Sequence, residues 1–372
     1  MVDDKIMAVP EEHTMVRRQT DPLRAVTSNW FVIVMGLGGM IDAVAKVWGL
    51  TGTIGSWIEV AVWVNAGIFV VLLGIWLIRW FLAPAEMWRE MTHPAHGHFF
   101  ALIPIAMTIE GLNWSLMGRE FGGSILDLVM NVAWILSIGF GVLFSILITD
   151  AMMRQHSPRP EHVSFAWLLG SVATALFPLL GNVIVSRELH LSLAWVRFVN
   201  VVDIAFFGMG FFVFLFFTAF LLSRYFTGPE PPAQVTPTSW LLLGAAAVLS
   251  LGVVGLAQSS AHMGLIAPSG FALLLGLALW GLAGWSFLLA LTITLRVWFT
   301  GQLPFTLSWW AFVFPLSAYL IDSRVLAGAL HTPWLKGWSD GLFVVASVFF
   351  LIVLAGTLIA FASGRVFKRE EA

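Results

Sequence analysis

Three acidic residues lie deep inside apolar stretches of the chain. Asp42, Glu110 and Asp322 each stand 11 or 12 residues after the aromatic residue that opens the stretch, which corresponds to about 17 Å along a helix. A carboxyl group at such a depth in a membrane is a functional candidate, either as a proton carrier or as the partner of a cation. Lys46 and Arg324 are cations within reach in the sequence, so both alternatives stay open.

Prolines interrupt alternate apolar stretches, and a phenylalanine precedes two of them. Pro104 lies in the third stretch, and the pairs Phe177-Pro178 and Phe314-Pro315 lie in the fifth and ninth. An interior proline removes one helical hydrogen bond and kinks the helix. The freed backbone groups are tolerated at membrane depth only where protein or water satisfies them. A phenylalanine at such a kink could close a narrow water path by dewetting.

Glycines replace proline in the two remaining stretches of this alternate set. Gly36 and Gly38 lie in the first stretch and Gly252 in the seventh, and we expect them to interrupt their helices in the same way. Glycine and proline are also simply commoner in membrane helices than in soluble ones. At any single position this explanation is the better one, but the confinement of prolines to alternate stretches favours a path lined by that set.

Histidine and cysteine give no support for a metal or haem site. His93, His96 and His98 form the densest histidine cluster, but no second ligand group faces them by spacing. The chain has no cysteine, which excludes disulfides and thiolate metal sites. It also has no zincin, nucleophile-elbow or phosphate-loop motif. We therefore expect neither a cofactor nor an enzymatic activity, and no nucleic-acid partner.

The elements that must position these residues are membrane helices. Of the 372 residues, 59% are hydrophobic and 11% are charged, whereas a soluble domain carries about a quarter charged residues. A membrane span needs about 20 apolar residues, and the sequence contains ten such runs: 27–49, 57–83, 98–117, 123–150, 162–185, 193–226, 238–258, 268–299, 307–323 and 338–364. We expect tails at 1–26 and 365–372 around one transmembrane domain, and an exposed loop from Thr227 to Pro237.

The ten runs form a fivefold repeat. Aromatic residues open the odd-numbered runs, and arginines close the even-numbered ones roughly every 70 residues, at Arg79, Arg154, Arg224, Arg296 and Arg365. Such a period indicates units that bury their faces against one another. We expect an all-α membrane protein of five tandem helical hairpins with pseudo-fivefold symmetry, whose first helices alone line a central cavity. A compact bundle without a central path is the alternative.

Charge places both ends of the chain on one side. With the N-terminus inside, 13 of the 19 lysines and arginines fall on the inner side, so the positive-inside rule predicts that both termini are cytoplasmic. The repeated arginines then lie at the inner interface, where their side chains can extend to the lipid headgroups. Asp42 and Glu110 would lie in the outer half of a pore wall, neutralised by cations or by protons.

Three segments resemble one transporter family. The segment Asn29–Gly39 is similar to the "WF…MGTG" start of that family's first helix, His93–Pro104 to the "HP…F…LIP" start of its third, and Ser308–Leu316 to the "WWA..FP" of its ninth. The family is the tellurite-resistance and C4-dicarboxylate transporter family, with bacterial TehA-type proteins, yeast malate permeases and plant slow anion channels. Leu37 departs from the usual threonine, and the seventh helix lacks a proline that relatives often have.

The resemblance implies a homotrimer in which each subunit passes small anions through its own pore. It implies that an occluding phenylalanine on the ninth helix, here Phe314, is the gate. Phe177, at the other Phe-Pro pair, is a candidate for a second constriction. The expected function is an inner-membrane channel or channel-like transporter for chloride, nitrate, sulfite, malate-like dicarboxylates or tellurite. A proton-coupled C4-dicarboxylate carrier and a membrane structural or assembly protein are the alternatives. The pore-lining candidates are Gly36, Gly38, Pro104, Pro178, Gly252 and Pro315, with Asp42, Glu110 and Asp322 in the wall.

Overall fold

Every regular element in the described part of the chain is helical. The computed structural model describes residues 25–117, 123–154, 163–188, 192–228, 231–266 and 270–367. Within them, nine helices are long and apolar enough to cross a bilayer, as the sequence predicts for nine of its ten runs. The remaining run, the third (98–117), corresponds to the 3-10 turn η2 (Gly97–Ala101) and the shorter helix α6 (Leu102–Ser115).

The long helices fall into a buried set and an exposed set. Between 67% and 83% of the most apolar window is buried in four helices, counted with their leading turns. These are α3 (Phe31–Trp48), α8 (Leu169–Glu188), α10 (Leu241–His262) and α12 (Trp310–Leu330). Only 17% to 28% is buried in α4 (Gly52–Leu82), α7 (Gly123–Arg154), α9 (Leu193–Thr227), α11 (Gly270–Phe299) and α13 (Pro333–Ala362). Because α6 is buried along nearly its whole length, it belongs with the first set, which we call the inner helices.

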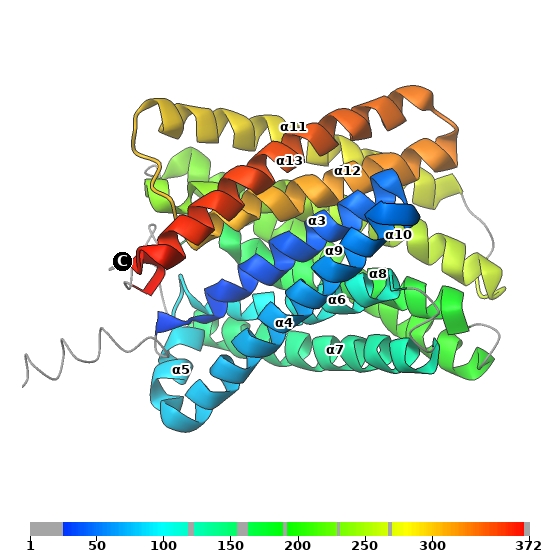
Figure 1. Cartoon of the computed structure of the whole chain (residues 1–372), viewed down its shortest axis with the longest axis horizontal. Coiled ribbons are helices and arrows are strands. Elements are labelled where there is room, and N and C mark those ends of the chain that lie inside the picture. Colours follow the sequence, from blue (N-terminus) through cyan, green and yellow to red (C-terminus); the bar gives the residue numbers. More distant parts are fainter. Residues whose placement is uncertain are drawn as a thin grey trace, which may run out of the picture.

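The inner helices contact one another in a closed circuit. Along the chain, α3 packs on α6, α6 on α8, α8 on α10 and α10 on α12, and α12 returns to pack on α3. Each inner helix also packs against the outer helix that follows it in the chain. In Figure 1, α11 and α7 lie on opposite sides of the molecule with α3 between them. This arrangement leaves the apolar faces of the outer helices exposed, as lipid contact requires.

A 3-10 turn leads into every inner helix, and the aromatic residues of the repeat lie in these turns or directly after them. The turns are η1 (Ser28–Trp30), η2, η5 (Phe165–Leu168), η6 (Ala233–Trp240) and η7 (Leu307–Trp309). The Trp240 indole donates to Thr294 Oγ1 of α11 at 2.9 Å, and the Trp310 indole donates to Thr357 Oγ1 of α13 at 3.0 Å. Buried tryptophan needs such an acceptor, so these bonds fix the start of an inner helix against an outer one.

The sequence prediction holds only in part for the segment between α9 and α10. It predicts an exposed loop from Thr227 to Pro237, but η6 begins at Ala233 and its residues from Thr236 to Trp240 are buried. A short 3-10 turn lacks the i→i−4 hydrogen bonds of an α-helix, so Pro237 can lie inside it without breaking that ladder. The prediction of an exposed loop therefore fails at Thr236 and Pro237, which belong to the buried part of η6.

Arg79 is also placed differently from the sequence prediction. Its side chain is only 2% exposed and does not extend to the membrane surface. It donates to the carbonyl of Val26 at 2.8 Å and to Glu90 Oε1 at 2.7 Å. Glu90 belongs to α5 (Pro84–Met91), a short helix that the sequence analysis did not predict and that buries Met87 and Met91. Arg79 therefore holds the segment before η1, α4 and α5 together.

Candidate functional site

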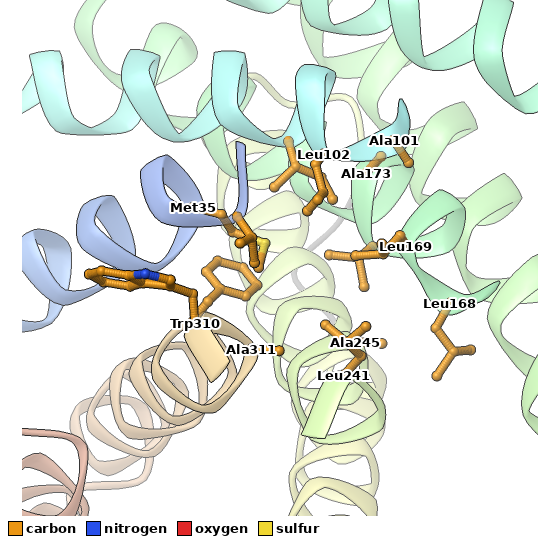
Figure 2. Packing of buried hydrophobic residues seen from close by; sticks show 14 of the residues in the cluster. Met35, Ala101, Leu102, Leu168, Leu169, Ala173, Leu241, Ala245, Trp310 and Ala311 are labelled. Atoms are coloured by element: carbon orange, nitrogen blue, oxygen red, sulfur yellow. The ribbon is translucent and has the colours of Figure 1, made fainter. Parts of the chain in front are cut away.

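The inner helices meet in an apolar constriction near their N-terminal ends. Figure 2 shows Met35 of α3, Leu102 of α6 and Leu169 of α8 pointing toward one another, with Ala245 of α10 and Ala311 of α12 on the opposite side. All five side chains are buried in one hydrophobic cluster. A water-filled passage at this level would need these side chains to move apart, so the structure is closed here.

Phe314 lies close to this constriction, between α12 and α3. The residue is 4% exposed, and a Cβ atom built on Gly39 would lie 3.0 Å from Cδ2 of its ring. Ser317, one turn further along α12, faces the same part of α3, and its hydroxyl has no hydrogen-bond partner in the described part of the chain. The ring therefore occupies the space that the missing side chain of Gly39 leaves open.

Phe177 points away from the other inner helices. Its ring packs edge-on against Phe206 of α9, with centroids 5.5 Å apart, and a Cβ on Gly141 of α7 would lie 2.5 Å from Cζ. The residue is fully buried between α8 and these two outer helices. We therefore do not retain Phe177 as a second constriction.

The glycines singled out in the sequence do not interrupt their helices. Both α3 and α10 continue through Gly36, Gly38 and Gly252 without a break. A Cβ on Gly36 would lie 2.5 Å from Cε3 of Trp310, and one on Gly38 would overlap Ile109. At Gly36 and Gly38 the absence of a side chain lets neighbouring helices approach closely, and this packing role accounts for these glycines without a kink.

The prolines differ in position. Pro178 and Pro315 lie inside α8 and α12, so each removes the hydrogen bond of the carbonyl four residues earlier. Pro104 lies in the first turn of α6, directly after η2. At the start of an α-helix the missing N–H disrupts less of the helical ladder, and Pro104 is the weakest kink candidate of the three.

Asp42 and Glu110 lie together between α3 and α6. The amide of Asn113 donates to Asp42 Oδ1 at 2.9 Å and to the carbonyl of Gly38 at 3.1 Å. The Asn65 amide of α4 in turn donates to Asn113 Oδ1 at 3.1 Å. Glu110 lies close enough to Asp42 to interact electrostatically, and its carboxyl oxygens accept no hydrogen bond of ordinary geometry within the described residues.

Cations do not neutralise this pair in the described part of the chain. Lys46 forms no ion pair there, and Arg324 is paired with Asp340. Asp322 lies apart from the pair, fully buried, and accepts a hydrogen bond from Ser250 of α10 at 2.8 Å. Two of the three acidic residues predicted from the sequence are thus brought together, and amides and hydroxyls take the place of the expected cations.

Asp203 of α9 is a buried carboxyl group that the sequence analysis missed. Its Oδ1 accepts a hydrogen bond from the Trp134 indole at 2.9 Å, and Oδ2 lies against Gly181 of α8 with no partner in the described residues. The same test of depth within an apolar run would have found it, had the even-numbered runs been included.

A cavity of about 320 Å³ lies between the outer helices α7 and α9. Its lining includes Phe144 and Ile148 of α7, Phe216 of α9 and, at its inner side, His98 and Trp167, whose rings stack 4.8 Å apart. The sequence prediction was a main cavity lined by the first helix of each hairpin alone. This cavity does not fit that prediction, because two outer helices form much of its wall.

Comparison with known proteins points to one family. The family model described as voltage-dependent anion channel, SLAC1, matches residues 25–358. An uncharacterized transporter of Methanocaldococcus jannaschii is 25% identical over 92% of this chain and 96% of its own. The malic acid transport protein of Schizosaccharomyces pombe is 23% identical over 79% of this chain and 68% of its own. A sulfite efflux pump of Arthroderma benhamiae is 21% identical over 82% of each chain.

The family match agrees with the helices and with the motifs. It covers all the described helices up to the last turn of α13, and nine of those helices are apolar enough to span a membrane. The resemblance of three segments to the tellurite-resistance and C4-dicarboxylate transporter family is confirmed by relatives named for transport, malic acid and sulfite. The chain is thus a multi-pass membrane protein that belongs to the SLAC1 family of voltage-dependent anion channels.

Proposed function

We propose that the protein conducts small anions along the axis of the five inner helices and that Phe314 closes this path. The observation that carries the proposal is the position of the Phe314 ring, which fills the gap left by Gly39 and belongs to the same buried cluster as Met35 and Ala311. An apolar constriction of this kind excludes water. An ion would have to lose its hydration shell to cross it, and the constriction offers no polar group in return. Displacement of this ring, together with separation of the buried side chains of Met35, Leu102 and Leu169, would then open the path.

A pseudo-fivefold arrangement of five hairpins is part of the proposal. It is supported by the closed circuit of inner helices, by the outer helix that packs on each of them and by the 3-10 turn that precedes each one. We further propose that both termini are cytoplasmic, that the protein lies in the inner membrane and that it forms a homotrimer. The distribution of lysine and arginine supports the orientation, and the family resemblance motivates the trimer.

The substrate class follows from the charges of the inner helices and from the names of the relatives. Among the described residues of these helices, lysine and arginine occur only in the C-terminal parts, at Lys46, Arg187 and Arg324. An anion in the middle of the path would be favoured by backbone dipoles alone, and such weak binding suits conduction. Relatives named for malic acid and sulfite make these two anions the first to test, followed by chloride, nitrate and tellurite.

Anion flux in proteoliposomes tests the proposal. Purified protein would be assayed with sulfite, malate, chloride, nitrate and tellurite, each with and without an imposed pH gradient. We expect flux of at least one of these anions that responds to membrane potential and needs no pH gradient. Flux that depends strictly on the pH gradient would replace the channel by a carrier, and no flux of any anion would favour a structural or assembly role.

A proton-coupled dicarboxylate carrier is the second candidate, and the Asp42–Glu110 pair is the observation that favours it. The Asp42 carboxyl is bonded to the Asn113 amide, forms no ion pair with a described cation and has the Glu110 carboxyl beside it, an arrangement typical of proton relays. The carrier requires that one of these groups takes up and releases a proton in each cycle. The channel requires only that the pair stays neutral enough not to repel the anion.

Asp42→Asn separates these two candidates. Asparagine keeps an oxygen that can accept the Asn113 hydrogen bond, so the packing is preserved while the titratable group is lost. We expect anion flux to stay within about threefold of wild type, a barrier change below about 0.7 kcal/mol. Flux and pH change would be recorded together in the same vesicles, with Asp150→Asn, at an exposed carboxyl of α7, as the control for a carboxyl outside the pair. Loss of uptake driven by a pH gradient in Asp42→Asn alone would contradict the channel.

A further inference from the structure

One face of α3 leads from Phe314 to the C-terminal ends of the inner helices. Met35, Gly39, Asp42 and Lys46 follow one another at intervals of three or four residues, which places them on the same side of the helix. Met35 is fully buried and Gly39 contacts the Phe314 ring, whereas Asp42 is partly exposed and Lys46 is exposed. Exposure to solvent therefore increases along this face, away from the constriction.

The other inner helices show the same gradient at the same end. Asn182 near the end of α8 and Arg324 of α12 are partly exposed, and Gln258 near the end of α10 is exposed. The N-terminal parts of these helices are almost completely buried. We call this region, defined by Asp42, Lys46, Asn182, Gln258 and Arg324, the mouth. The exposure of the side chains on the inner helices therefore increases toward the mouth.

Two positive charges lie close together at the mouth. Arg324 donates through Nη2 to the carbonyl of Val47 at 3.1 Å and through Nη1 to Asp340 Oδ1 at 2.5 Å, which fixes its guanidinium group at the end of α3. Lys46 lies near enough to Arg324 to feel its charge. Asp42, one turn before Lys46, is bonded to Asn113 instead of to the lysine.

Among the described residues, only one of these two cations is therefore held in an ion pair. Asp340 offsets the charge of Arg324, and Lys46 has no ion-pair partner in the part of the chain that the structure describes. Like charges at short range repel, and an anion between them would relieve the repulsion. A lysine in the last turn of a helix also interacts favourably with the helix dipole. An experiment must distinguish this stabilising role from anion binding.

We propose that Lys46 and Arg324 form an anion-capture site at the mouth, where an inorganic anion or a carboxylate binds before it reaches Phe314. This inference rests on the proposed function and adds to it the site where the anion is taken up. The Lys46 ammonium group, on a flexible side chain, would contact the anion directly. Arg324 would contribute through the N–H groups that Val47 and Asp340 leave unused. The site concentrates anions locally and leaves the rate of passage through the constriction to Phe314.

The test is the dependence of flux on chloride or sulfite concentration for a series of charges at position 46. We expect Lys46→Gln to raise the half-saturating concentration about tenfold, the lower end of electrostatic concentration effects in charged clefts, and to leave the maximal flux unchanged. Lys46→Arg should behave as wild type, and Lys46→Glu should raise the half-saturating concentration further than Lys46→Gln. A lysine that only stabilises the helix end would change thermal stability but not this order.

Lys336→Gln is the matched control. Lys336 is an exposed lysine in the first turn of α13, outside the face of α3 that leads to Phe314. We expect its saturation curve to equal that of wild type. An equal shift of the half-saturating concentration in Lys46→Gln and Lys336→Gln would show a general surface-charge effect. It would overturn the proposed capture site. Wild-type curves for Lys46→Gln and Lys46→Glu, in a protein that conducts and is opened by Phe314→Ala, would overturn the capture site while leaving the proposed function intact.

Discussion

We expect Phe314→Ala to raise anion conductance at least about tenfold. A tenfold increase corresponds to a barrier lowered by about 1.4 kcal/mol. The ring lies against Gly39, where no side chain from α3 can replace it. Truncation to alanine therefore leaves a gap beside the constriction, and water can enter where the ring excluded it. Anion preference should persist, because backbone dipoles and pore width act along the whole path. Currents in planar bilayers and thermal unfolding would be measured on the same preparation.

Phe177→Ala is the matched control for this prediction. It removes the same side chain at the equivalent Phe-Pro pair, but its ring is packed between α8, α7 and α9. We expect a stability loss of about 3 to 5 kcal/mol, typical of a truncated buried phenylalanine, and no gain in conductance. A Phe314→Ala protein that is destabilised to the same extent and conducts no better than wild type would end the gate hypothesis.

The fold was predictable from the sequence to the extent that it depends on apolar length. Nine runs of sufficient length became helices that can span a membrane, with bounds close to those predicted. The third run is different, since the polar residues His98, Glu110 and Asn113 interrupt it and the helix that forms is short. Run length predicted that a helix exists there but not where its 3-10 turn gives way to an α-helix.

The site was less predictable because it depends on the rotation of each helix about its axis. Phe177 and Phe314 occupy equivalent places in the sequence, yet one ring faces two outer helices and the other faces α3. Asp42 has a lysine one turn away, but its partner is Asn113, 71 residues further along the chain. A repeat fixes which residues share a depth in the membrane. It does not fix which neighbour each side chain meets.

The role of a glycine was also hard to predict from the sequence. A glycine in an apolar run reads equally well as a helix break, as a packing contact or as an accident of membrane composition. Only the structure identifies Gly36 and Gly38 as packing contacts, because atoms of Trp310 and Ile109 would meet a Cβ at these positions. Gly181, which the sequence analysis did not select, has the closest approach of all the described glycines, because the Asp203 carboxyl lies over it.

Gly181→Ala is therefore expected to destabilise the protein by about 3 kcal/mol, the upper range for an overpacked interior. The new methyl group would overlap Asp203 Oδ2 and lie 2.5 Å from Cγ. The carboxyl group would have to leave, and the hydrogen bond that it accepts from the Trp134 indole at 2.9 Å would break. A buried carboxyl group without that bond adds its own cost. Thermal unfolding in detergent measures the loss.

Gly67→Ala supplies the comparison that separates this contact from the general effect of replacing a helical glycine. No atom lies within 4 Å of a Cβ built on Gly67 of α4, and alanine is favoured over glycine in a helix by about 1 kcal/mol, so this variant should be as stable as wild type or more so. Adding Asp203→Ala to Gly181→Ala should restore part of the lost stability, since residues in contact do not contribute additively. If Gly181→Ala unfolds at the same temperature as Gly67→Ala, the close approach of α8 and α9 at Asp203 is wrong. A restored double variant would instead show that this carboxyl group is what requires a glycine at position 181.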